Sequence, residues 1–192
     1  MAIKFKSTRY KGIYVLQPSF YSAVSSFFNL FISEEKQKKS QTLLMKIEIN
    51  QSNKIEQTSK DTVIGIANEK TFTVLITRKI KRKLQEEFRK QGRPGLFVYR
   101  TFIAGVVLAF KYAQLKNLSQ IVIDEEYCGK DKMLKSMFLE MWSRFFREIP
   151  EISFDKIGRN SKVHNICYLT MKGKYKPDRI VRFEEVKRLA LK

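Results

Sequence analysis

Cysteine is scarce in this chain, with only Cys128 and Cys167 among 192 residues. They lie far apart and neither belongs to a CxxC pair, which argues against a disulfide framework and against a zinc ribbon. The single histidine, His164, precedes Cys167 by three positions, but these side chains have no obvious fourth partner for a tetrahedral zinc ion. We therefore expect no structural zinc.

Acidic residues are also few, with 19 Asp and Glu against 38 Lys and Arg, a formal net charge of +19 and a sequence pI near 10.0. Such an excess attracts polyanions, and nucleic acid is the commonest of these. Anionic membrane surfaces and membership of a ribonucleoprotein assembly are the alternatives. A hydrophobic content of 43% argues against wholesale disorder, and the length is enough to bury a substantial core.

The chain shows no clear targeting signal, internal repeat or low-complexity tract. Residues 12–33 carry no charge, but their many polar side chains and Pro18 make them a poor membrane span. We interpret 13–16 as a strand and the part after Pro18 as an aromatic-rich helix, with a peripheral membrane helix as the alternative. We expect a cytoplasmic protein with an N-terminal extension, 1–42, and one α/β domain with a basic C-terminal tail, 43–192.

The domain is predicted to begin with three strands. Residues 43–50 alternate between apolar and polar side chains, and two further β-rich runs at 62–67 and 72–77 are joined by a short turn. The helix expected at 96–115 is strongly apolar, but Arg100 and Lys111 interrupt it, so it is interpreted as a buried core helix rather than a membrane span. The remaining expected elements are helices at 78–90, 130–146 and 162–171 and strands at 121–123 and 151–157. This order predicts a mixed sheet that starts with a three-strand meander and has helices on its faces.

Three acids follow the strand at 121–123, namely Asp124, Glu125 and Glu126. The carboxyl end of a strand is where ligands bind in open α/β sheets. Acids are also common as ordinary loop charges and at the starts of helices. We interpret Glu125 and Glu126 as solvated turn charges and take Asp124 as the candidate for a functional site.

The order of elements, together with Asp124, resembles the ribonuclease H-like fold of ribonucleases H, retroviral-type integrases, transposases and junction resolvases. The resemblance implies a divalent-metal-dependent nuclease or related phosphoryl-transfer enzyme acting on DNA or RNA, with acids from the first and fourth strands holding two Mg²⁺ or Mn²⁺ ions. Asp124 matches the fourth-strand acid and Glu48 the first-strand acid, so these two would be metal ligands. His164 lies where the last helix of the family supplies a further catalytic ligand.

The chain departs from that pattern in two places. The family usually carries Asp in its first strand, where this chain has Glu48, and the helix at 96–115 contains no carboxylate, although ribonucleases H usually contribute one there. Asp61, Glu69 and Asp155 are the substitutes available at neighbouring strand ends. The alternative function is therefore a non-catalytic nucleic-acid-binding or ribonucleoprotein subunit, in which His164 would be a capped, partly buried helix residue.

Basic residues gather in two clusters, one within 78–93 and one within 159–182. Phosphate contacts supply affinity and register without reading sequence, and the chain contains no recognisable base-reading motif. The alternative for each cluster is a solvated helix face. The candidate nucleic-acid-binding residues are Arg78, Lys79, Lys81, Arg82, Lys83, Arg93, Arg159, Lys162, Lys174 and Lys176.

Overall fold

The computed structural model describes residues 8–10, 13–15, 45–115 and 117–191, and the chain divides into two units, Met1–Leu43 and Leu44–Lys192. In the first unit, strands β1 (Thr8–Tyr10) and β2 (Ile13–Val15) pair antiparallel. The strand expected at 13–16 is therefore present as far as Val15. The helix expected after Pro18 lies outside the described residues.

The second unit is built on a six-stranded mixed sheet in the order β7-β6-β3-β4-β5-β8. Strands β3, β4 and β5 are successive antiparallel neighbours, β6 runs parallel to β3, β7 parallel to β6, and β8 parallel to β5. The predicted mixed sheet with its three-strand meander is confirmed. The strands are β3 (Met45–Ser52), β4 (Thr62–Ala67), β5 (Thr71–Ile76), β6 (Leu118–Asp124), β7 (Glu151–Asp155) and β8 (Arg179–Ile180).

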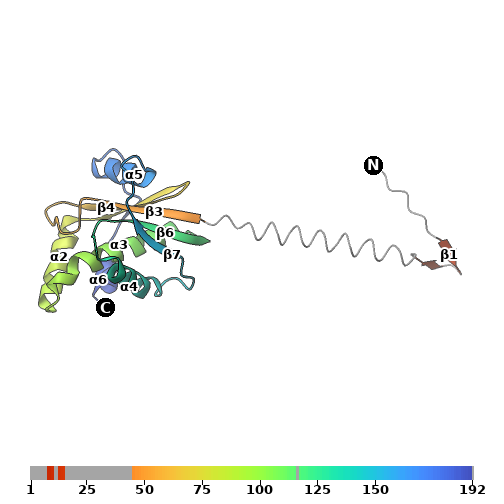
Figure 1. The fold of residues 1–192 in the computed structure, drawn as a ribbon, viewed down its shortest axis with the longest axis horizontal. Helices are drawn as coiled ribbons and strands as arrows, with labels where there is room; N and C mark the ends of the chain where they lie inside the picture. Colours follow the sequence, from red (N-terminus) through yellow and green to blue (C-terminus); the bar gives the residue numbers. More distant parts are fainter. Residues whose placement is uncertain (1–7, 11–12, 16–44, 116, 192) are drawn as a thin grey trace. The chain divides into compact units, whose positions relative to one another are not determined.

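Helices cover both faces of this sheet, as Figure 1 shows, with α5 on one face and α3, α4 and α6 on the other. Helix α2 packs against α3 and α6. The helices are α2 (Arg78–Lys90), α3 (Phe97–Ala113), α4 (Asp131–Trp142), α5 (Lys162–Met171) and α6 (Phe183–Ala190), with a 3₁₀ turn at Pro94–Leu96 before α3. α2 and α5 have the predicted bounds, and Ser161 caps α5 by accepting a hydrogen bond from the His164 amide.

Helix α3 is the centre of the main core. Most of its residues are buried against β4 and β5, where they meet the apolar side chains of one sheet face. Pro94–Ala113 is long and apolar enough to cross a membrane by length and composition, and two thirds of the relevant window is buried inside the protein. The interpretation of this segment as a core helix is confirmed. On the sheet side, the core includes Ile47, Ile49, Ile121 and Ile123, all fully buried.

Helix α4 ends at Trp142, earlier than the expected end at Phe146. The chain turns tightly there, since the amides of Phe145 and Phe146 both donate to the Trp142 carbonyl at 3.0 Å. The Trp142 indole is 1% exposed and stacks between Phe138 and Phe146, with ring centroids 5.0 and 4.0 Å away. Its Nε1 donates to the Glu148 carbonyl at 2.8 Å, so the buried ring has its one polar atom satisfied.

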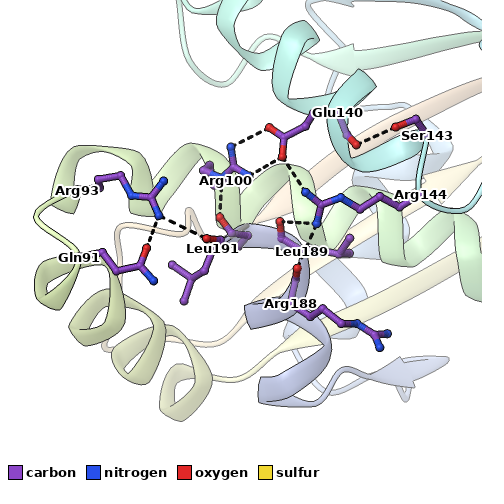
Figure 2. Close-up of polar contacts among 10 residues, drawn as sticks. Gln91, Arg93, Arg100, Glu140, Ser143, Arg144, Arg188, Leu189 and Leu191 are labelled. Carbon is purple, nitrogen blue, oxygen red and sulfur yellow. Dashed lines mark hydrogen bonds and ion pairs between the residues drawn. The ribbon is translucent and has the colours of Figure 1, made fainter.

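The last turn of α6 is held by two arginines, shown in Figure 2. Arg100 of α3 is 7% exposed, donates to both carboxylate oxygens of Glu140 at 2.9 Å, and donates through Nε to the Ala190 carbonyl. Arg144 donates to Glu140 at 2.8 Å and to two further carbonyls of the same turn of α6. Hydrogen bonds from Arg100 lower the pKa of Glu140. The C-terminal helix is thus joined to α3 and α4 through one shared carboxylate.

Helix α5 approaches the sheet most closely at Gly65 of β4. A Cβ atom built at Gly65 would lie 2.5 Å from the Sγ of Cys167, so any larger residue there collides with the helix. Val163 and Cys167 pack on Val63 and Ala67 in a small second core. The close approach lets α5 lie directly over the ends of the central strands.

Gly65→Ala is expected to lower the free energy of unfolding by about 1–3 kcal/mol, because the added methyl group displaces Cys167 and with it α5. Urea denaturation followed by circular dichroism measures the loss. The double variant Gly65→Ala/Cys167→Ala should recover part of it, since the colliding sulfur is gone. A double variant less stable than Gly65→Ala alone would show that the clash is not the cause.

Candidate functional site

The carboxyl ends of β3 and β6 bring Asn50 and Asp124 to the same level of the sheet. Ile49 is paired with Ile123 in these parallel strands, so the next residue of each strand lies beside the other. Asn50 is also opposite Gly65, on the sheet face that α5 covers. Because side chains alternate along a strand, Asn50 and Asp124 both belong to this face.

Asn50 is 2% exposed and is enclosed by α5. Its Nδ2 lies 3.3 Å from Nδ1 of His164, and its carbonyl accepts a hydrogen bond from the Cys167 thiol at 3.3 Å. An amide nitrogen can only donate, so Nδ1 of His164 is the acceptor in this contact. The structure therefore brings the predicted His164 to the strand ends, where its contact is a neutral amide.

Asp124 is half-buried and lies beside an acid of the neighbouring strand β7. The parallel register pairs Asp124 with Asp155, and the Asp124 Oδ1 accepts a hydrogen bond from the Ile157 amide at 2.8 Å. The Asp155 Oδ1 accepts from the Lys156 amide at 2.7 Å. Of the substitutes named from the sequence, Asp155 is the one that the fold places beside Asp124.

The other candidate acids lie elsewhere. Glu48 is opposite Val122, which lies two residues before Asp124, and the Glu48 carboxylate faces the Lys46 ammonium at 3.9 Å. Asp61 accepts from the Arg78 amide at 2.7 Å and so helps to begin α2. Glu69 follows β4, which runs antiparallel to β3. Glu69 and Asp124 therefore lie toward opposite ends of the strands.

A two-metal centre needs several carboxylate oxygens at one place. Among residues 45–115 and 117–191, no three His, Cys, Asp or Glu side chains come close enough together to hold a metal ion. The position beside Asp124 in β3 is occupied by the amide of Asn50, and one Asp124 oxygen already accepts a backbone hydrogen bond. The residues present thus do not fit the two-metal set that the resemblance implies.

Glu126 corrects one expectation from the sequence. Its side chain is 15% exposed, and its carboxylate lies 3.5 Å from the Lys54 ammonium, which also donates to the Glu126 carbonyl. Burial raises the pKa of Glu126, against the opposing charge of Lys54. It is a paired, partly buried acid rather than a solvated turn charge, because the loop between β3 and β4 folds over it.

Tyr127 ties that loop to the strand ends. Its hydroxyl donates to Glu56 and accepts from Gln51, each at 3.2 Å, and burial raises its pKa. Its ring packs edge-on against Tyr99 and Phe102 of α3. These contacts between distant parts of the chain carry no sequence signal, whereas Asn50 has one, because it is the last residue of the strand predicted at 43–50.

Helix α2 presents a basic surface formed by Arg78, Lys79, Arg82 and Lys83, all exposed. We call these four residues the α2 basic face. Lys81 is the exception, since it is fully buried and therefore cannot contact a phosphate. Its ammonium donates to the carbonyls of Lys54 (3.2 Å) and Gln57 (2.9 Å) and to Thr62 Oγ1 (2.8 Å). Burial lowers the pKa of Lys81 to about 8, opposed by Asp61 and Glu56.

The other predicted basic residues lie around α5 and near the C terminus. Arg159, Lys162, Lys174 and Lys176 are exposed, although the Lys162 ammonium also donates to the carbonyls of the β4–β5 turn. Arg93 is exposed and donates to the Leu191 carbonyl at 3.4 Å. The α2 basic face and the basic residues around α5 belong to helices on different sides of the sheet, as Figure 1 shows.

No family model, curated protein or solved structure matches this chain. The class that the structure defines is an α/β protein with a six-stranded mixed sheet and helices on both faces.

Proposed function

We propose that residues 44–192 are a nucleic-acid-binding domain with a ribonuclease H-like fold that holds DNA or RNA without metal-dependent cleavage. Support for the fold comes from the sheet, in which the first and fourth strands of the domain, β3 and β6, are parallel neighbours after an antiparallel meander. The proposed lack of nuclease activity is supported by Asn50, whose buried amide lies where a second acid would be needed beside Asp124.

The observation that carries the binding function is the α2 basic face. Seven basic and two acidic residues precede residue 44, so the domain itself keeps 31 basic against 17 acidic side chains, a net +14. Four cations on two successive turns of one exposed helix surface are spaced to meet a phosphate backbone. Such contacts hold a polyanion by charge and are independent of its sequence.

A metal-dependent nuclease is the second candidate, and the observation that favours it is the pairing of Asp124 with Asp155 on adjacent strands. Bound Mg²⁺ or Mn²⁺ stays a prediction of this candidate. The two functions differ in one result, which is turnover in the presence of the metal.

Binding to labelled single-stranded and duplex oligonucleotides should weaken steeply as salt rises, and the plot of log affinity against log salt should be linear. Replacing the four residues of the α2 basic face by Gln should reduce the slope on duplex by up to about 3.6, because each released counterion contributes about 0.9. Fluorescence anisotropy from 50 to 300 mM salt, about the range in which such slopes are resolved, provides the measurement.

The charge-matched control replaces Lys130, Lys132, Arg147 and Lys156, four exposed residues outside α2, by Gln. It lowers the net charge equally and should change the slope less than the α2 variant. Equal effects of the two variants would mean that net charge alone, and not this surface, binds the ligand. Cleavage with Mg²⁺ or Mn²⁺ that is lost in Asp124→Asn but kept in Glu125→Gln would overturn the non-cleaving function in favour of the nuclease.

A further inference from the structure

Two tyrosines stand exposed on the α5 side of the domain, within a lysine-rich stretch. Tyr168 of α5 is 49% exposed and Tyr175, just beyond the helix, is 54% exposed. They are the exposed large aromatic side chains of the described residues. Lys172, Lys174 and Lys176 are exposed between and beside them. We call these five residues the tyrosine patch.

The charge of this stretch is of one sign. No Asp or Glu occurs from Lys162 to Pro177. The first acid after the stretch, Asp178, accepts hydrogen bonds from the amide and hydroxyl of Thr73 in β5, at 2.7 and 2.8 Å. Its carboxylate is therefore engaged with the sheet and is not paired with the lysines.

The backbone of the patch is held at both ends. Gly173, at φ +75°, closes α5, with its amide donating to the Thr170 carbonyl and the Lys174 amide donating to the Leu169 carbonyl, both at 3.0 Å. Beyond the patch, Asp178 fixes the chain to β5 and Arg179 pairs with Val74 of the same strand. A segment anchored in this way loses little conformational entropy when a ligand binds.

One cation already lies near an aromatic ring in the patch, since the Lys172 ammonium is 5.5 Å from the centre of the Tyr168 ring. Exposed aromatic faces beside a basic track are the features with which proteins hold single strands, because every base offers a stacking face and every nucleotide a phosphate. A duplex cannot use the rings, since its bases are stacked inside the helix.

We propose that the tyrosine patch binds single-stranded nucleic acid, with unpaired bases stacking on Tyr168 and Tyr175 and the backbone phosphates lying along Lys172, Lys174 and Lys176. This inference rests on the proposed nucleic-acid-binding function and specifies the form of ligand taken by the α5 side. The α2 basic face, which has no exposed aromatic ring, serves any phosphate backbone.

The test compares wild type with Tyr168→Leu/Tyr175→Leu, in which apolar bulk is kept and the rings are lost. Anisotropy is measured with a labelled 20-nucleotide single strand and with its duplex, a length of roughly one to five single-strand binding sites. The double variant should bind the single strand about 5- to 100-fold more weakly at an unchanged salt slope, and the duplex almost as wild type does. Replacing the three lysines by Gln should instead lower the single-strand salt slope by about 2.

Ile149→Ala is the matched control for the tyrosines. Ile149 is an exposed apolar residue (63% exposed) that lies just before β7, outside the tyrosine patch. Its substitution should leave single-strand affinity unchanged. If the tyrosine variant binds single strands as wild type does while the α2 variant loses affinity, this inference is overturned and the proposed function stands. If wild type binds no oligonucleotide, this inference and the proposed function both fail. If the patch variants lose binding only to phosphatidylserine vesicles, the tyrosine patch is a membrane-binding surface and this inference is overturned.

Discussion

Lys81→Ala should destabilise the protein by about 3 kcal/mol or more, although the residue belongs to a run of lysines and arginines. The substitution leaves two backbone carbonyls and the Thr62 hydroxyl without their donor, and each lost buried hydrogen bond costs roughly 1 kcal/mol or more. It also opens a cavity beneath the β3–β4 loop. Urea denaturation at neutral pH measures the loss.

Lys83→Ala is the control, because Lys83 is exposed on the same helix and its removal should change stability by no more than about 0.5 kcal/mol. The pH dependence supplies a second check. The folded pKa of about 8 lies below the ordinary value of 10.5, so the unfolded chain binds more protons between these values. The stability of wild type should therefore rise relative to Lys81→Met as the pH goes from 8 to 10.5. A Lys81→Ala variant as stable as Lys83→Ala would contradict the buried role.

Glu140→Ala should cost about 3 kcal/mol, because it leaves the guanidinium of Arg100 inside the protein without its carboxylate partner. Arg100→Leu should cost a similar amount, since it removes the donor to the Ala190 carbonyl and frees the last turn of α6. Thermal and urea unfolding measure both losses.

The double variant Arg100→Leu/Glu140→Leu distinguishes a coupled pair from two separate contributions. Its loss should be clearly smaller than the sum of the two single losses, because no buried charge is left unpaired. Glu151→Ala, at an exposed acid with no ion pair among the described residues, provides the background value. Additive losses would show that Arg100 and Glu140 act independently.

Periodicity explains why the elements were predictable. The alternation in 43–50 and the helical spacing in 78–90 follow directly from which side chains face a core, so the strands and helices appear close to their expected bounds. Lys81 differs from the other basic residues of 78–93 in being buried, so a run of basic residues does not by itself indicate that all of them face solvent. Lys81 lies three and seven positions before Leu84 and Phe88, and this spacing places it on the buried stripe of the same helix.

The candidate site was only partly predictable. Asp124 is predictable because it directly follows a buried strand, and Asn50 is the corresponding last residue of the predicted strand 43–50, although β3 continues to Ser52. The pairing of Glu126 with Lys54 joins residues far apart in the chain, and only the folded loop brings them together. No local pattern records such a contact.

The stacked position of Trp142 separates folding from binding in the experiments described above. It is the only tryptophan of the chain, and it lies between Phe138 and Phe146 on the α4 side of the sheet, whereas the tyrosine patch lies on the α5 side. Its emission reports the packing of α4 against α3, on the opposite face of the sheet from α5. Indole fluorescence can therefore follow the unfolding of every variant in the presence of oligonucleotide, while the labelled nucleic acid reports occupancy through a separate optical channel.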